Sequence, residues 1–353
     1  MLAQRGPRGY PALMLQLLLS CQTPPPAAMP IHVGSEDTAT VGVSEGCPQV
    51  TFTNTAGAVT DMTTTFTQGT PTTITDDGTL LFCPGDWFVR LTATGSLSIL
   101  GAGREETTLS GGEQGTVLAV SGGALTVEGV TIDRGRALGA GNKAQGGGVY
   151  CDDGASVRLS AVDFTNNHAF DGGAIFAIDD CAVTATDVSF VDNTADDDGG
   201  TICAWFGGSI TLSGVSITGS TARDGGGIFV YQGALSLDGS TLSDNSASTN
   251  GGAILSYQSD LTISDTTLQG NQAQGGGAIL SAGDAVLSSV TFANNQAEDG
   301  GGAMLAYTST TTTGTDCRFE GNSPNDISTT GGSYSFEALV SFYCDDLGCV
   351  LAD

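Results

Sequence analysis

The chain has 353 residues, 53 of them glycine, and carries 38 acidic against 10 basic side chains, which gives a formal net charge of −28. A surface this acidic repels phosphate backbones, so nucleic-acid binding is excluded as the expected function.

Residues 1–20 are predicted to be a secretory signal. Two arginines precede an apolar run at 12–19, which is the order of a basic start and a short hydrophobic centre. The closing sequence LLSC, residues 18–21, resembles the lipobox of bacterial lipoproteins. That resemblance implies that Cys21 is acylated and becomes the first residue of the mature chain. A plain signal peptide with an incidental cysteine is the alternative.

The next segments connect this signal to the repeats. Residues 21–35 contain three consecutive prolines and are predicted to be a stiff tether after the acylated Cys21. Residues 36–76 are expected to form an N-terminal cap or irregular coils. We expect an outer-membrane or cell-surface lipoprotein that touches the membrane only through its lipid anchor, or otherwise a secreted protein.

Cysteine usage agrees with an exported protein. Without Cys21, eight cysteines remain, an even number that suits an oxidising compartment. Cys344 could pair with Cys349, and Cys47 with Cys83, while spacing leaves the rest of the pairing open. The others are Cys151, Cys181, Cys203 and Cys317.

A glycine pair followed two residues later by an aliphatic residue recurs seven times, in steps of 25 to 27 residues. A period of this length predicts a stacked solenoid, in which each repeat contacts only its neighbours. We expect one elongated monomer rather than two domains. The copies begin at Gly146, Gly172, Gly199, Gly225, Gly251, Gly276 and Gly301.

A second mark runs in phase with the glycines: an apolar residue, a short polar residue three places later, and then x-Ala. The polar residues are expected to stack along the axis as a ladder of side-chain amides. Ser220 interrupts this ladder and predicts a local weakness. The ladder residues are Asn167, Asn193, Asn245, Asn271, Asn295 and Asn322.

Three apolar segments recur in each repeat, as in Val157/Leu159, Val162 and Ile175. Alternation with a period of two predicts short strands with one buried face, and no room remains for a helix within a repeat. The sequence therefore predicts an all-β fold, a single-stranded parallel β-helix over residues 77–330 with about 25 residues and three strands per coil. Residues 331–353 are apolar enough to cap its open end.

The GGAI-like and FxxN-like marks resemble the repeat of chlamydial polymorphic outer membrane proteins, which are surface-exposed right-handed β-helices. The stretch from Gly78 onwards also resembles the first coils of pectin-lyase-like β-helices. Together the resemblances cover Gly78 to Asn322. They imply a right-handed coil and a surface location, and they identify a scaffold rather than an activity.

Acidic residues precede successive glycine pairs. Stacked carboxylates about 5 Å apart repel each other unless a cation lies between them, so a Ca²⁺ site is one interpretation and solvated turns are the other. No other cofactor is expected. The candidate ligands are Asp171, Asp198 and Asp224.

Aromatic residues occupy the sixth position after the first glycine of several repeats. On a β-helix they form a stripe that could stack against sugar rings, or else they pack beneath a loop. The candidate ligand-binding residues are Trp205, Tyr231 and Tyr257.

One turn, between Ile132 and Gly146, is longer than its counterparts. By the pectin-lyase-like resemblance, it could supply a base for proton abstraction, or clustered aspartates for hydrolysis. An ordinary loop is the alternative. The candidate catalytic residues in and near this turn are Arg134, Arg136, Lys143, Asp152, Asp153 and Asp171.

The leading hypothesis is a non-enzymatic, lipid-anchored surface β-helix, an adhesin-like or envelope-structural binding scaffold with a polysaccharide or cell-surface ligand. The alternative is a carbohydrate-active enzyme, either a polysaccharide lyase or a glycoside hydrolase, or else a polysaccharide-binding β-helix. The position of the 132–146 turn relative to the aromatic stripe separates these hypotheses.

Overall fold

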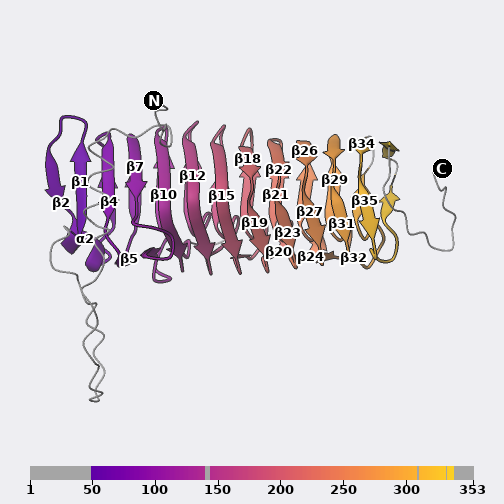
Figure 1. Cartoon of the computed structure of the whole chain (residues 1–353), viewed down its shortest axis with the longest axis horizontal. Helices are drawn as coiled ribbons and strands as arrows, with labels where there is room; N and C mark the ends of the chain where they lie inside the picture. Colours follow the sequence, from indigo (N-terminus) through magenta and orange to yellow (C-terminus); the bar gives the residue numbers. More distant parts are fainter. Residues whose placement is uncertain (1–48, 140–143, 308–309, 331, 338–353) are drawn as a thin grey trace, which may run out of the picture.

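The computed structural model describes residues 49–139, 144–307, 310–330 and 332–337, and it shows a parallel β-helix with its strands stacked along one long axis (Figure 1). The predicted signal at 1–20, the tether at 21–35 with Cys21, and Lys143 lie outside the described residues. So do Cys47, Cys344 and Cys349.

Three sheets form the wall of the coil. The chain runs from sheet A through sheet C to sheet B and then enters sheet A of the next coil. Sheet B has 11 strands in chain order: β3 (Thr72–Ile74), β6 (Leu91–Ala93), β9 (Leu118–Ser121), β11 (Val149–Asp152), β14 (Ile175–Ala177), β17 (Ile202–Trp205), β21 (Ile228–Tyr231), β25 (Ile254–Tyr257), β29 (Ile279–Ala282), β33 (Met304–Ala306) and β36 (Ile327–Thr329).

Sheet A is the largest of the three, with 20 strands. They are β1 (Val50–Asn54), β2 (Val59–Asp61), β4 (Gly78–Phe82), β5 (Gly85–Phe88), β7 (Ser96–Leu100), β8 (Thr107–Ser110), β10 (Ala124–Asp133), β12 (Ser156–Thr165), β15 (Ala182–Val191), β18 (Ser209–Ser213), β19 (Ser216–Thr218), β22 (Ala234–Asp238), β23 (Thr241–Ser243), β26 (Asp260–Ser264), β27 (Thr267–Gln269), β30 (Ala285–Ser288), β31 (Thr291–Ala293), β34 (Thr311–Thr315), β35 (Arg318–Glu320) and β37 (Ser333–Glu337).

Sheet C is short and has six strands. It forms at the x-Ala of the second mark, where no strand was predicted. The strands are β13 (His168–Ala169), β16 (Thr194–Ala195), β20 (Thr221–Asp224), β24 (Ser246–Asn250), β28 (Gln272–Ala273) and β32 (Gln296–Ala297).

The two strands predicted before each asparagine belong to one bent sheet. In β12 the bend falls at Ala161, whose φ is 51°, and the same place in the following coils holds Asp187 at 53° and Gly214 at 62°. Pairing with the neighbouring coils continues on both sides of the bend. Each coil contributes to three sheets, but from β18 on the sheet A segment of a coil is divided into two strands, and the third sheet comes from the short x-Ala segment.

Equivalent residues of successive coils pair in register, so identical or similar side chains stack in columns inside the coil. Burial of each such side chain stabilises the fold by about 1.5–3 kcal/mol. One column has no exposed surface at all and consists of Val149, Ile175, Ile202, Ile228, Ile254, Ile279 and Met304.

The asparagine ladder is confirmed. Asn271 shows the pattern: its Oδ1 accepts from the backbone N–H and the side-chain amide of Asn245, both at 3.0 Å. Its own Nδ2 donates to the carbonyl of Leu242 and to Oδ1 of Asn295. Each rung is buried and satisfies backbone groups of the turn that would otherwise lack partners.

At the predicted gap, Ser220 is fully buried and its backbone N–H donates to Oδ1 of Asn245 at 3.0 Å. Its hydroxyl lies 2.6 Å from the hydroxyl of Thr201. Thr201 occupies a position that is Ala174 one coil earlier. The added hydroxyl therefore gives the serine a partner that the ladder does not supply.

The first coil is covered by a hairpin and a short helix. Strand β1 runs antiparallel to both β2 and β4, and helix α2 (Thr63–Thr67) packs Phe66 against Phe82 with ring centroids 5.2 Å apart. At the other end of the coil β37 pairs with β34, and the ring centroids of Phe336 and Phe319 are 5.5 Å apart. No helix in the described residues is long and apolar enough to cross a membrane.

One disulfide joins Cys151 to Cys181, and Cys83 is also disulfide-bonded, although its predicted partner is not among the described residues. Cys203 and Cys317 are buried thiols.

Replacing Asn271 with alanine is expected to destabilise the protein by about 2–4 kcal/mol, because the N–H of Asn245 and the carbonyl of Leu242 lose buried partners. Urea unfolding measures the change. The control is Gln269→Ala on the exposed face of β27, for which we expect less than about 0.5 kcal/mol. Equal losses for the two variants would show that the ladder adds nothing to stability.

Candidate aromatic binding site

An aromatic ridge lies where the strands of sheet B end and the chain turns toward sheet A. We define it as Trp205, Phe206, Tyr231 and Tyr257. Residues 205, 231 and 257 pair in register on β17, β21 and β25. The centroid distances are 6.1 Å from Trp205 to Phe206, 5.4 Å from there to Tyr231, and 5.7 Å from Tyr231 to Tyr257. The predicted stripe is therefore a continuous row of touching rings.

The rings differ in exposure. Phe206 is 47% exposed and Tyr257 is 43% exposed, whereas Trp205 and Tyr231 are half-buried. Trp205 packs edge-on against Phe176 at 5.4 Å, and its Nε1 is buried without a hydrogen-bond partner in the described part of the chain. Trp205 thus forms the base of the ridge, and the open rings of its neighbours form the surface.

Phe206 was not predicted from the sequence, because the aromatic residues of the other repeats recur at the preceding position. Its φ is 46°, in the left-handed region that a bulky side chain rarely adopts. The same position holds Asp179, Gln232 and Gln258 in other coils, with φ of 51–52°. The turn demands this backbone conformation, and here it places an exposed ring in the row.

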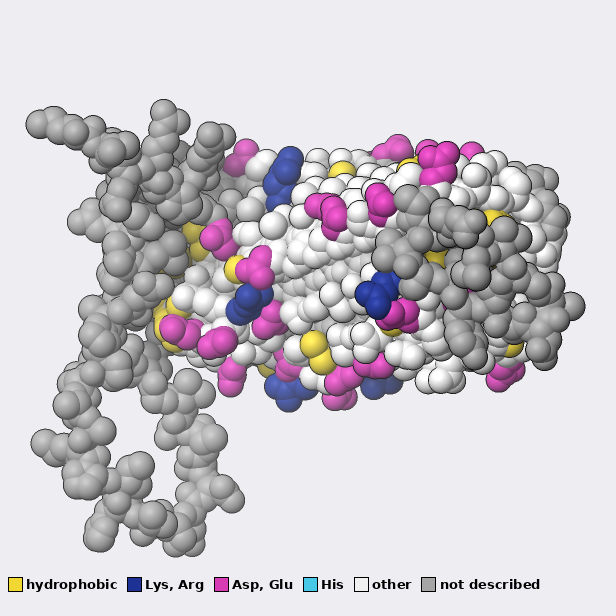
Figure 2. Space-filling model, turned by 45° about the vertical axis from the view of Figure 1, so that its right-hand side comes forward, with side chains coloured by type: hydrophobic (Ala, Val, Ile, Leu, Met, Phe, Trp, Pro, Cys, Tyr) yellow, Lys and Arg dark blue, Asp and Glu magenta, His cyan; other side chains and the backbone are white. Residues whose placement is uncertain are grey.

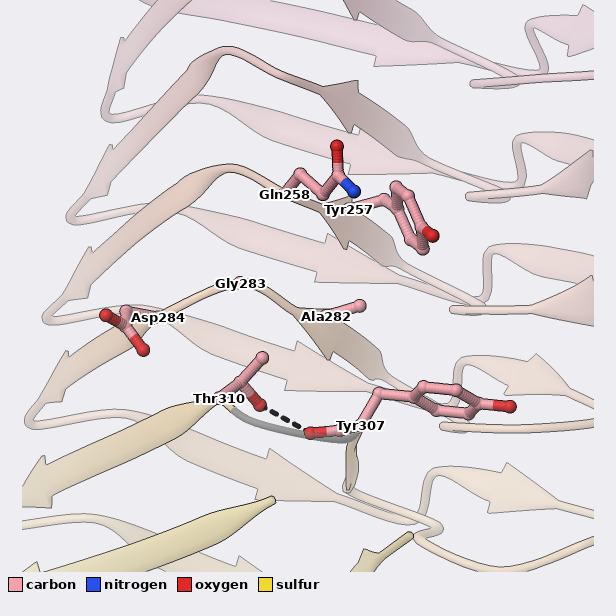
Figure 3. A pocket seen from close by; sticks show the side chains of 7 residues that line it. All are labelled: Tyr257, Gln258, Ala282, Gly283, Asp284, Tyr307 and Thr310. Carbon is pink, nitrogen blue, oxygen red and sulfur yellow. Dashed lines mark hydrogen bonds between the residues drawn. The ribbon is translucent and has the colours of Figure 1, made fainter. Parts of the chain in front are cut away.

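The row is interrupted at Ala282, which pairs with Tyr257, and resumes at Tyr307. Two coils separate the tyrosines, which is about 10 Å at the usual strand spacing. Figure 3 shows both rings pointing to the same side, with the small Ala282 side chain between them. We call this opening the slot.

The slot belongs to an open pocket of about 410 Å³. Tyr307 is 45% exposed. Gln258 accepts a hydrogen bond from Gln232 at 2.9 Å through its Oε1. The pocket is lined by Tyr257, Gln258, Ala282, Gly283, Asp284, Tyr307 and Thr310.

The predicted aspartate column lies at the opposite end of the sheet B strands. Carboxylate oxygens of Asp171, Asp197 and Asp198 lie within 4.8 Å of one another, and Asp171 and Asp198 are buried. Arg223 already brings a positive charge to this cluster, with its Nη2 2.7 Å from Asp197 and 3.7 Å from Asp198.

The third predicted ligand, Asp224, is held separately. One of its oxygens accepts from Nε of Arg223 at 3.0 Å, and the other accepts from Nδ2 of Asn250 at 3.0 Å. The structure therefore brings together Asp171 and Asp198, adds Asp197, and gives Asp224 its own partners. Binding of Ca²⁺ here stays a prediction.

Burial raises the pKa of Asp198 to about 8, and the carboxylates of Asp197 and Asp171 add to the effect. Burial also raises the pKa of Asp171 to about 6. The backbone N–H of residue 198 donates to Oδ1 of Asp171 at 3.3 Å. Near neutral pH this cluster holds fewer negative charges than its side chains suggest.

The described candidate catalytic residues are not gathered at one place. The side chain of Arg134 forms an ion pair with Asp133 at the end of β10. The backbone of Arg136 forms an isolated β-bridge with His168 at the edge of sheet C. Asp171 precedes β14. The remaining two, Asp152 and Asp153, lie at the far end of β11.

The described parts of the 132–146 turn and the aromatic ridge also lie apart. Arg136 is next to sheet C, and the backbone of Gln145 forms a β-bridge with Asp171 just before the strands of sheet B begin. The ridge lies at the other end of these strands. One catalytic groove shared by the two features is therefore not formed by these residues.

Figure 2 shows acidic side chains spread over the visible face, with the few basic ones beside them. In the described part of the chain, Arg104 lies 3.5 Å from Asp163 and 3.2 Å from Asp187. The local positive charge of such arginines is balanced by neighbouring carboxylates, so the surface as a whole stays negative.

Fold and site together define a β-helix scaffold with one exposed aromatic edge. The right-handed β-helix region family matches residues 184–339, and the Chlamydia polymorphic membrane protein repeat matches residues 161–178. These matches and the observed coil confirm the resemblance to β-helix proteins with this type of repeat. No protein with a curated description matches the sequence.

Two solved structures show a weak structural similarity to this chain. The A-module of mannuronan C-5 epimerase AlgE4 from Azotobacter vinelandii has 14% identity over 74% of this chain and 87% of its own, with a TM-score of 0.30. The catalytic domain of Agl-KA has 12% identity over 78% and 64%, with a TM-score of 0.33. A structural similarity this weak says nothing about the chemistry of this chain.

Stability is expected to fall as the pH rises from about 4 to about 8. Over this range the folded protein keeps a proton on Asp198, and in the lower part of the range it also keeps one on Asp171. In the unfolded chain both carboxyls have the ordinary aspartate pKa of 3.8, so both have released their protons. Asp198→Asn cannot ionise, so its stability should fall less. Free energies of unfolding in urea at about pH 5 and about pH 9 measure the difference.

The matched control is Asp299→Asn, an exposed acid outside the cluster, which should keep the wild-type pH dependence. If the wild-type protein were instead more stable at the higher pH, the cluster would have to be ionised in the folded state.

Proposed function

We propose that the chain is a non-enzymatic, surface-exposed β-helix scaffold that binds polysaccharide along its aromatic ridge and slot. One observation carries the proposal: open aromatic rings at Phe206, Tyr257 and Tyr307 follow one edge of a rigid solenoid. Aromatic faces stack on the apolar faces of sugar rings, and a row of them parallel to the axis suits an extended chain of sugars.

The exposure of these rings needs a reason, because contiguous apolar surface on a soluble scaffold usually marks a binding site. Phe206 adds to this argument, since a bulky residue in the left-handed region costs about 1–3 kcal/mol. Asparagine or glycine would fit that turn at lower cost. Strain that places a ring at the surface favours a binding role.

The support for binding rather than catalysis comes from placement. The described catalytic candidates lie on different elements, and Arg134 is paired with Asp133. A carbohydrate-active enzyme remains the second candidate function. Chain cleavage by the wild-type protein in a panel of acidic and neutral polysaccharides would establish it and overturn the non-enzymatic part of the proposal.

The surface location rests on the repeat type and on the predicted lipid anchor at Cys21. Metabolic labelling with a fatty acid, compared between the wild-type chain and Cys21→Ser, tests the anchor. Label in the wild type alone supports it, and absence of label in both contradicts it.

Replacing Tyr257 and Tyr307 together with alanine is expected to weaken polysaccharide binding by about tenfold or more, because two stacking surfaces are lost. Glycan-array binding identifies the ligand, and calorimetry measures its affinity.

The control is Tyr334→Ala, a tyrosine 49% exposed on β37 of sheet A, away from the ridge. This variant should bind as the wild type does. An equal loss in both variants would point to a general effect on folding, and unchanged binding in the double variant would remove the ridge from the proposal.

A further inference from the structure

We propose that the pocket that includes the slot between Tyr257 and Tyr307 binds a segment of polysaccharide that carries a cationic amine. This inference rests on the proposed polysaccharide-binding function and names the class of ligand. The argument combines the geometry of the two rings, the carboxylates at the other side of the pocket and the distribution of positive charge.

The two tyrosines provide the stacking surfaces. They project on the same side, about two coil spacings apart, with only Ala282 between them (Figure 3). An opening of this size admits one sugar ring next to the faces of the two aromatic side chains. The same faces attract an ammonium group through their ring quadrupoles.

Carboxylates lie on the other side of the pocket from the rings, and Figure 3 shows Asp284 beyond Gly283 on the side away from Tyr257 and Tyr307. Asp284 lines the pocket and is exposed, and its Oδ1 accepts from the backbone N–H of Thr311 at 2.9 Å. Its second oxygen makes no hydrogen bond within the described residues. Asp260 is also exposed and is adjacent on the preceding coil, because Leu261 pairs with Ala285. Two neighbouring negative charges thus lie at the side of the pocket away from the rings, where an amine on a bound sugar chain can reach them.

Gln258 supplies the neutral polar contact. Its Oε1 is engaged by Gln232, which leaves its amide N–H groups directed to other acceptors such as sugar hydroxyls. Such a group orients a ring without adding a charge to the pocket.

The surroundings disfavour acidic sugars. Among the described residues, neither lysine nor arginine lines the pocket, so a uronate would meet Asp284 without a compensating cation. The net charge of −28 also attracts a cationic polymer over longer distances. The pocket is therefore complementary to an amine and repels a carboxylate.

The test compares three oligosaccharides of equal length: a glucosamine oligomer, its fully N-acetylated counterpart and a uronate oligomer. The full chain is titrated with each by calorimetry at about pH 5, where the amino groups of the sugar are protonated and exposed carboxylates are ionised. We expect the glucosamine oligomer to bind about threefold to tenfold more tightly than the N-acetylated one, and the uronate to bind least. Added salt should reduce this preference.

The deciding variant is Asp284→Asn, whose side-chain oxygen can still accept from Thr311. It should lose the preference for the amine and keep the affinity for the N-acetylated oligomer. Asp299→Asn, an exposed acid elsewhere, should keep the preference.

The outcomes separate the two proposals. Equal binding of the amine and N-acetylated oligomers, with both weakened by removal of the two tyrosines, overturns this inference and supports the binding function. A preference that survives in Asp284→Asn and in Asp260→Asn also overturns it, as does tightest binding of the uronate. No binding of any polysaccharide to the folded wild-type chain contradicts the proposed function itself.

Discussion

In-register stacking of equivalent residues is the constraint on which this structure depends. A side chain such as Ile228 is covered by Ile202 and Ile254 rather than by a distant segment. The asparagine ladder fixes the same register through buried hydrogen bonds. Because the register is fixed at every coil, any residue type that recurs at one position becomes a straight row on the surface. The aromatic ridge is a direct consequence of the rule that builds the core.

Those rows are what the sequence allowed us to predict. The columns that include Ile175 and the ladder through Asn271 follow from the period alone, since each needs only its counterpart one coil away. Features that depend on the turns were missed. Sheet C has too few residues per strand to show alternation, as at His168–Ala169. Phe206 lies in the ridge because its backbone is left-handed, and the sequence period does not reveal this conformation.

The contacts of residues that have no counterpart in neighbouring coils could not be predicted from the repeat either. Arg223 has no counterpart in neighbouring coils, yet its guanidinium lies among the carboxylates predicted as a cation site. Cys151 and Cys181 are bridged with a Cα–Cα distance of 6.0 Å, a pairing that spacing in the chain left open. The Ala282 gap is visible in the sequence, but its meaning depends on exposed tyrosines on both sides. Specificity in this scaffold therefore comes from departures from the repeat.

The central claim is that a polysaccharide lies along the ridge and enters the slot. A crystal structure of the chain with a bound oligosaccharide tests it most directly. The account predicts sugar rings stacked over Phe206 and Tyr257, with one ring between Tyr257 and Tyr307. An oligosaccharide bound instead beside the 132–146 turn, with the ridge bare, would contradict it.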